Sequence, residues 1–155
     1  MAVQGGYTLN HGRAYAGMLA DAQASNTVTR LNSTGAAIPF GRFVSTVGFS
    51  GMKLAGAGEA IAGVTRRILE HATPDVGAFA IQDNIDGAVV TMGSIWVEAT
   101  EVFAAGDFVA AVTAAGADQG KASKAASAAA GVPNTVVVGY DADAKLVQVS
   151  MRVGG

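Results

Sequence analysis

The sequence predicts an all-β protein, a small antiparallel β-barrel or sandwich that is jelly-roll-like, with an extended N-terminal arm. Roughly eight short runs rich in β-branched and aromatic residues are separated by turn signals containing Gly, Pro, Asn or Asp. Little of the chain has the composition of a packed helix. Short strands at close spacing are typical of a barrel or sandwich.

The domain organisation follows from the length and from a change of pattern near residue 26. A chain of 155 residues is expected to form one domain with a core of its own. We predict an arm at residues 1–25 and a single β domain at residues 26–155. Within that domain, residues 114–131 are rich in Ala and Ser and contain no large apolar side chain that would anchor a helix, so we expect an exposed loop there.

The arm has neither a strand pattern nor a strong helix pattern, because glycine interrupts it repeatedly. It nevertheless carries large apolar side chains, namely Tyr7, Leu9, Tyr15, Met18 and Leu19. We expect it to become ordered by lying on its own domain, on a neighbouring copy or on a larger partner. A short helix over residues 14–24 and a frayed terminus are the alternatives.

The first half of the β domain contains three predicted strands. Residues 26–31 are dominated by β-branched side chains. Residues 38–47 and 60–65 are apolar runs, and the glycine-rich residues 48–58 between them predict a wide turn. Pro39 cannot donate a ladder hydrogen bond, which places it at the start or the edge of a strand.

The second half continues the pattern. Residues 77–82 predict a short strand, and residues 88–99 give the strongest strand signal of the chain. Residues 108–113 follow a turn and pair back as a hairpin. Residues 135–140 and 145–153 predict a final hairpin, the last strand alternating apolar and polar side chains.

Charged residues are unusually scarce. They make up 14% of the chain, against roughly 25% in ordinary soluble domains, while half of the residues are hydrophobic. A monomer with so few charges exposes large apolar areas, and such areas mark interfaces. We therefore predict a subunit of an assembly, with a compact Ala-rich monomer as the alternative.

Several classes of partner are disfavoured. The formal net charge is −2 and the longest basic cluster is Arg66-Arg67, so we expect no nucleic-acid partner. No apolar run is long enough for a membrane-spanning helix, and the first residues lack the order of a signal peptide, so we expect no membrane association and no Sec export. The absence of Cys excludes disulfides and thiolate metal sites.

Catalytic and metal-binding patterns are also poorly supplied. Residues 56–58 lack the Lys and Ser or Thr that complete a phosphate-binding loop. The acidic loops at residues 83–86 and 141–143 offer too few oxygens for calcium. Glu98 and Glu101 are three residues apart at a strand end, hence on opposite faces, which disfavours a glycosidase pair. We predict a protein that is not an enzyme and uses no metal or cofactor.

Four short motifs carry a resemblance to a known family. They are IPFGRFV at residues 38–44, AIAGVTRR at 60–67, GSIWVEA at 93–99 and GDFV at 106–109. Their order resembles that of the structural cement, or capsid decoration, proteins of tailed bacteriophages. The resemblance covers most of residues 38–113. It implies that the first two motifs are neighbouring strands and the last two form a later hairpin.

The resemblance also implies a function. Such proteins sit on the outer surface of the phage head in the virion, are made in the host cytoplasm, and bridge subunits of the major capsid protein. They are homo-oligomers, with a trimer favoured here and a dimer as the alternative. We expect capsid contacts from Tyr7, Leu9, Arg13 and Tyr15 of the arm, and core or subunit packing from Trp96 and Phe108.

Two other functions stay open at this point. The first is a carbohydrate- or cell-surface-binding β module of a phage head fibre or tail. The second is a small hydrolase or lyase, which the missing nucleophile and base disfavour.

Overall fold

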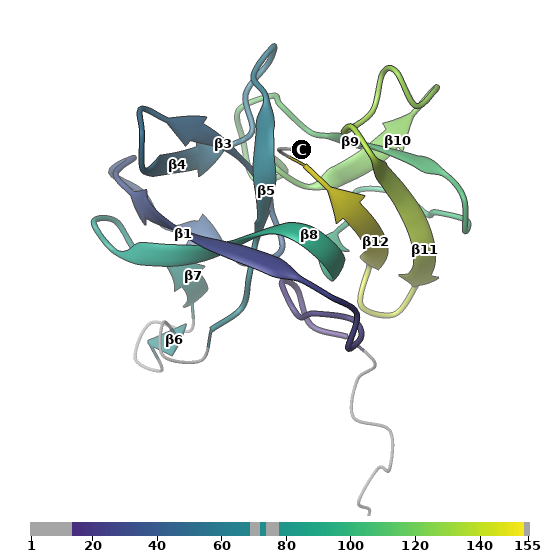
Figure 1. Cartoon of the computed structure of the whole chain (residues 1–155), viewed down its shortest axis with the longest axis horizontal. Coiled ribbons are helices and arrows are strands. Elements are labelled where there is room, and N and C mark those ends of the chain that lie inside the picture. Colours follow the sequence, from purple (N-terminus) through teal and green to yellow (C-terminus); the bar gives the residue numbers. More distant parts are fainter. Residues whose placement is uncertain (1–13, 69–71, 74–77, 154–155) are drawn as a thin grey trace, which may run out of the picture.

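The computed structural model describes residues 14–68, 72–73 and 78–153. Over these residues the chain forms strands and turns without a helix, and the all-β prediction is confirmed. Figure 1 shows two groups of strands side by side, joined through the long strand β8 and its neighbour β12.

The first group is a closed barrel of five strands. They are β1 (Asn26–Asn32), β4 (Gly51–Leu54), β3 (Phe43–Val47), β5 (Ile61–Thr65) and β8 (Asp86–Glu98), hydrogen-bonded in that order. The barrel closes because β1 pairs in parallel with β4 on one side and antiparallel with β8 on the other. Closure leaves these strands few free edges.

The second group extends the same sheet from the C-terminal half of β8. Its strands are β12 (Leu146–Arg152), β11 (Thr135–Asp141), β9 (Phe108–Ala111) and β10 (Ala122–Ala125), in that spatial order. An isolated parallel bridge from Ala122 to Ala99 brings β10 back to the chain that leaves β8. The strands therefore curl into a second, incompletely closed barrel.

A small separate sheet covers one end of the first barrel. It contains β2 (Ile38–Pro39), β7 (Ala78–Ile81) and β6 (Ala72–Thr73). Pro39 lies in a strand of only two residues, as its missing N–H requires.

The two groups of strands have neighbouring cores. The smaller core lies in the first barrel and contains Ile38, Phe40, Val44, Met52, Ile81 and Val89. The larger core lies between β8 and the second group. Its buried members include Phe43, Ile95, Val109 and Val149. From Val147 on, buried side chains alternate along β12, so this strand contributes every second residue to the interior. β8 is buried more continuously, including the neighbouring residues Val89 and Val90.

Residues 48–58 form more structure than the wide turn that their glycines predict. After a turn in which Gly48 has φ +58°, the residues of β4 pair with β3 as a hairpin. Met52 of β4 is fully buried in the smaller core. Burial of this one side chain fixes the strand that the frequent glycines concealed.

Residues 114–131 also contain a strand where a loop is expected. Ala122–Ala125 form β10, which pairs with all four residues of β9. Ala122 is fully buried and bridges to Ala99, directly after the end of β8. The lack of large apolar residues excludes a packed helix but not a strand in close contact with its neighbours.

Candidate interaction surface

The end of the predicted arm that the structure describes lies along β8. The N–H of Gly17 donates to the carbonyl oxygen of Trp96 at 2.8 Å, and the N–H of Trp96 donates to that of Met18 at 3.0 Å. Leu19 bridges antiparallel to Ile95. Residues 17–20 thus continue the edge that β1 occupies further along β8, so this part of the chain packs on its own domain.

Two glycines allow this close approach. A methyl group on Gly17 would lie 2.8 Å from the backbone N of Arg67 and the carbonyl oxygen of Thr65, and one on Gly41 would lie 2.7 Å from the N of Gly17. Both glycines have left-handed backbone angles, with φ of +77° and +68°. Their backbones cross without room for any side chain.

Tyr15 is the one predicted arm contact that the structure describes. Its side chain is about half exposed, and the guanidinium of Arg67 lies 4.8 Å from its ring centre. Together with Met18, Leu19 and Arg66 these two residues line a shallow hollow. Tyr7, Leu9 and Arg13 lie outside the described residues. The capsid role of all four stays a prediction.

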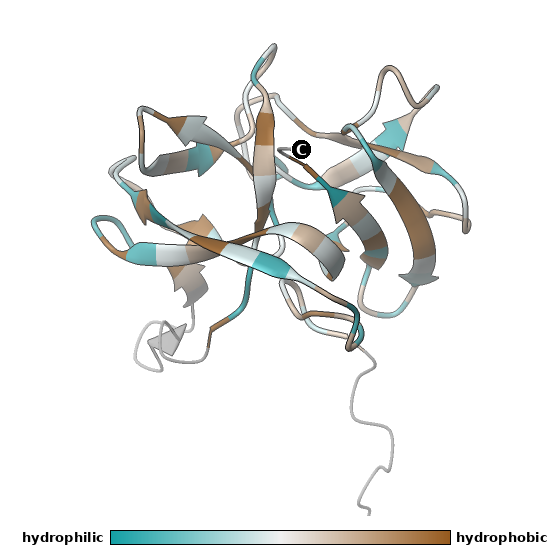
Figure 2. Ribbon diagram, in the orientation of Figure 1, coloured by the Kyte–Doolittle hydropathy of each residue, from teal (hydrophilic) through white to brown (hydrophobic). Residues whose placement is uncertain are grey.

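Phe108 lies on an apolar outer face of the second group of strands. It pairs with Val136 across β9 and β11, and both side chains are 39% exposed. Val138 is also exposed on β11, whose hydrophobic run is visible in Figure 2. We name these three residues the β9–β11 face.

Trp96 lies elsewhere. It is half-buried on β8 and pairs with Gln148 of β12. Two strands, β12 and β11, separate it from Phe108, so the structure does not bring the two predicted packing residues together. Their role in subunit packing stays a prediction.

A second apolar site was missed by the sequence reasoning. Phe49, in the turn between β3 and β4, is 102% exposed. Val47 and Ile85 are also exposed. They lie near Phe49 because the end of β1 links the two loops: the N–H of Leu31 donates to the carbonyl oxygen of Ser50 in the turn, and the N–H of Asn32 donates to that of Ile85 in the β7–β8 loop. The signal was available, because Phe49 is a large aromatic residue between the turn residues Gly48 and Ser50.

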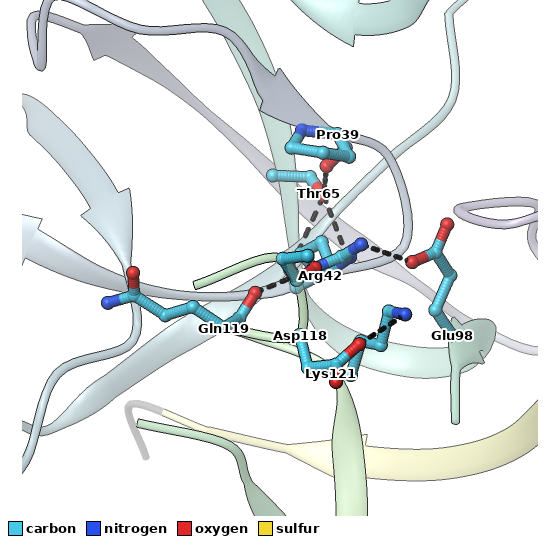
Figure 3. Close-up of polar contacts among 8 residues, drawn as sticks. Pro39, Arg42, Thr65, Glu98, Asp118, Gln119 and Lys121 are labelled. Atoms are coloured by element: carbon cyan, nitrogen blue, oxygen red, sulfur yellow. Dashed lines mark hydrogen bonds and ion pairs between the residues drawn. The ribbon is translucent and has the colours of Figure 1, made fainter. Parts of the chain in front are cut away.

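A buried arginine fastens the chain after β9 to the first barrel. Arg42 is 7% exposed, and its Nη2 lies 2.5 Å from Glu98 Oε2 (Figure 3). Its Nη1 donates to the carbonyl oxygens of Ala117 and Gln119 at 2.9 and 2.8 Å. Thr65 Oγ1 accepts the Arg42 N–H at 3.0 Å. The network holds the two groups of strands in one arrangement.

Glu98 and Glu101, which the sequence predicts to point to opposite faces, bind different partners in the structure. Glu98 binds Arg42, whereas Glu101 Oε1 accepts the backbone N–H of Lys124 on β10 at 2.6 Å. Each carboxylate therefore has its own structural partner.

Three carboxylates have lowered pKa values, of which Asp118 is exposed and Glu59 and Asp107 are half-buried. The N–H of Ala104, followed by Lys124, lowers the pKa of Asp107 below its ordinary 3.8. Hydrogen bonds from lysines do the same for Glu59 and Asp118, through Lys53 and Lys121 respectively. All three stay ionised at neutral pH and act as turn caps or ion-pair partners.

The described part of the chain contains neither a candidate metal cluster nor a candidate membrane-spanning helix. Over residues 14–68, 72–73 and 78–153, acidic and His side chains do not gather in groups of three suited to a metal ion. The same residues include no helix of the length and hydropathy needed to cross a bilayer.

Comparisons with known proteins match the chain to one protein family and to solved structures. Residues 3–152 match the family described as "Structural cement protein (E217 gp24/Pam3 gp6)". A chain in the solved structure "The capsid of Myoviridae Phage XM1" has the same fold, with a TM-score of 0.74 and 22% sequence identity over 99% of both chains. A comparison with curated proteins gives no match. Because the family match spans nearly the whole sequence, the chain belongs to the family of phage structural cement proteins.

Proposed function

We propose that this protein is a non-enzymatic capsid cement protein that binds the outside of a phage head and bridges subunits of the major capsid protein. The family match over residues 3–152 carries the proposal. The low content of charged residues and the exposed apolar sites at Phe49 and at the β9–β11 face support it, because such sites are covered in assemblies.

We further propose that the arm makes the capsid contact and that the β9–β11 face joins copies of the chain. Tyr7, Leu9, Arg13 and Tyr15 are the proposed capsid contacts. Phe108 is the principal subunit-packing candidate, with Trp96 as the second. The favoured assembly is a trimer, with a dimer as the alternative. An oligomer that engages several capsid subunits multiplies weak contacts by avidity.

Binding to phage heads tests the proposal directly. Heads lacking the protein are mixed with purified full-length protein, sedimented, and heated until they release DNA. We expect the protein to sediment with expanded heads and to raise the temperature of DNA release. Full-length protein that stays in the supernatant, or binds without changing that temperature, would contradict the proposed function.

Deletion of residues 1–13 tests the arm separately. The shortened chain keeps residues 17–20, which bond to β8, so it is expected to remain folded and oligomeric while losing head binding. Undiminished sedimentation of the shortened chain with heads would remove the arm from the capsid contact.

A further inference from the structure

A groove at the mouth of the first barrel contains two arginines. It has a volume of about 550 Å³ and is lined by residues from β1, β3, β5, β8 and β12. Arg30 projects into it from β1 and Arg152 from the end of β12. Apolar side chains, including Val28, Ile61 and Met92, make much of the remaining wall.

The two arginines lack the carboxylate partners that four other cations of the described structure have. Arg42, Lys53, Lys121 and Lys124 each form an ion pair with a carboxylate. Over residues 14–68, 72–73 and 78–153, Arg30 and Arg152 form none, and the groove lining contains no Asp or Glu. The Nε of Arg30 is moreover buried without a hydrogen-bond partner, as is that of Arg42, but only Arg30 lies in the groove. Such an orphaned donor is costly unless a ligand supplies an acceptor.

The groove continues into a second hollow of about 500 Å³. The two share Ala60, Ile61, Arg152 and Val153. Small residues dominate the walls of the second hollow, and its one carboxylate, Glu59, is already paired with Lys53. Walls of Gly and Ala let another backbone approach closely, which suits an extended peptide better than a compact ion.

The register of the sheet sets the spacing of the charges. Arg30 lies opposite Gly87 on β8, and Arg152 lies opposite Met92. Five residues of strand separate these points by about 17 Å. In an extended peptide, side chains four residues apart lie on one face at about 13 Å, within reach of two flexible arginine side chains.

We propose that this groove binds an extended acidic peptide segment of the protein on which the chain docks, with two carboxylates about four residues apart that pair with Arg30 and Arg152. This assignment rests on the proposed function for the identity of the partner. The chain's own first 20 residues do not fit, because they contain Arg13 and His11 but no Asp or Glu.

A blocked seven-residue peptide tests the groove without phage heads. The probe is Ala-Glu-Val-Ala-Val-Glu-Ala, and its control replaces both Glu by Gln. In amide NMR spectra of the full chain, the Glu peptide is expected to shift Ile61, Thr91 and Arg152, and the Gln peptide at least about tenfold less at equal concentration. Equal binding of both peptides, no binding, shifts elsewhere, or equal shifts from inorganic phosphate would overturn the proposal.

Charge reversal tests the same groove on heads. The variant Arg30→Glu/Arg152→Glu is expected to bind heads at least about tenfold more weakly than the wild type. Lys145→Glu is the matched control, since Lys145 is exposed directly before β12, whose far end carries Arg152. A thermal melt shows whether charge reversal unfolds the barrel. In that case Arg30→Gln/Arg152→Gln, which removes the charges without reversing them, replaces it in the binding test.

The outcomes of the two proposals are distinguishable. Wild-type binding that persists in both arginine variants contradicts the groove assignment but leaves the cement function standing. Failure of the wild type itself to bind heads contradicts the proposed function, and the peptide titration then decides the groove.

Discussion

Gly17 and Gly41 determine how the N-terminal part of the chain meets the barrel. Their backbones touch, and each is surrounded by backbone atoms that cannot move aside as a flexible side chain does. Pattern reasoning treats Gly17 as an interruption of the arm, since a sequence does not show which glycine contacts another backbone. The structure shows that this glycine is what allows residues 17–20 to pair with β8.

Replacement of Gly17 by Ala is expected to destabilise the protein by at least about 2 kcal/mol, from left-handed backbone strain and the clash with Arg67 and Thr65. Gly35→Ala is the matched control. Gly35 has nearly the same φ, +78°, but nothing within 4 Å of the added methyl group, so about 1 kcal/mol is expected. Urea unfolding of both variants measures the difference. Equal losses would show that the crossing of Gly17 and Gly41 contributes nothing.

Arg42 is the second residue with a disproportionate role. Arg42→Met is expected to lower the free energy of unfolding by about 3 kcal/mol, since it strands Glu98 and two carbonyl groups that the guanidinium satisfies. Lys121→Met removes the more exposed pair with Asp118 and is expected to have a much smaller effect. Guanidinium chloride unfolding compares the two. A loss for Arg42→Met no larger than that for Lys121→Met would contradict the anchoring role.

At the level of the elements, most strands could be predicted, including the four-residue strands β7 and β9, whereas the equally short β4 and β10 could not. The sequence indicates β8, β11 and β12 because their β-branched runs are long or alternate clearly. It conceals β4 and β10, where Gly and Ala make a turn or loop the better local prediction. Both strands are fixed by tertiary contacts, through burial of Met52 and Ala122, which local propensity does not contain.

The candidate surface likewise has one part that the sequence predicts and other parts that it does not. Phe108, one of the two predicted packing residues, is exposed and forms an apolar face together with Val136 and Val138. That β11 turns apolar side chains outward could not be read from its run of valines, because a strand that is apolar on both sides is equally expected in a buried position. The groove of Arg30 and Arg152 could not be predicted either, as 122 residues separate the two arginines in sequence and only the sheet brings them together.

The β9–β11 face predicts an effect on association rather than on folding. Val136→Thr/Val138→Thr keeps shape and strand preference, so the stability is expected to change by less than about 1 kcal/mol while association between copies weakens. Val102→Thr, at an exposed valine outside this face, is the control. Analytical ultracentrifugation measures the oligomer. An unchanged association constant for the double variant would exclude this face as the contact between copies.

The turn before β9 predicts a response to acid. The lowered pKa of Asp107 means that its ionised form stabilises the fold above pH about 4, the range of its ordinary pKa, and that this contribution is lost as the pH falls through the lower folded value. Asp107→Asn is expected to lower Tm at pH 7 and to flatten the decline of Tm between pH 5 and 3. Asp143→Asn, in the exposed β11–β12 turn, is the control. Parallel pH profiles for wild type and Asp107→Asn would contradict this role.

At the scale of the whole molecule, a rigid scaffold carries several incomplete surfaces. Closure of the barrel and the Arg42 network make one body of the two groups of strands. The β9–β11 face, the turn at Phe49 and the arginine groove each expose groups that a partner would cover or pair. For a member of the structural cement family, these surfaces are the proposed contacts of its capsid-associated role.

The most direct test is a cryo-electron microscopy map of phage heads that lack the protein and are then loaded with the purified full-length chain. We expect density on the outer surface that fits the two groups of strands and contacts at least two subunits of the major capsid protein. A map with no added density, with density inside the shell, or with each copy contacting a single capsid subunit would contradict this expectation.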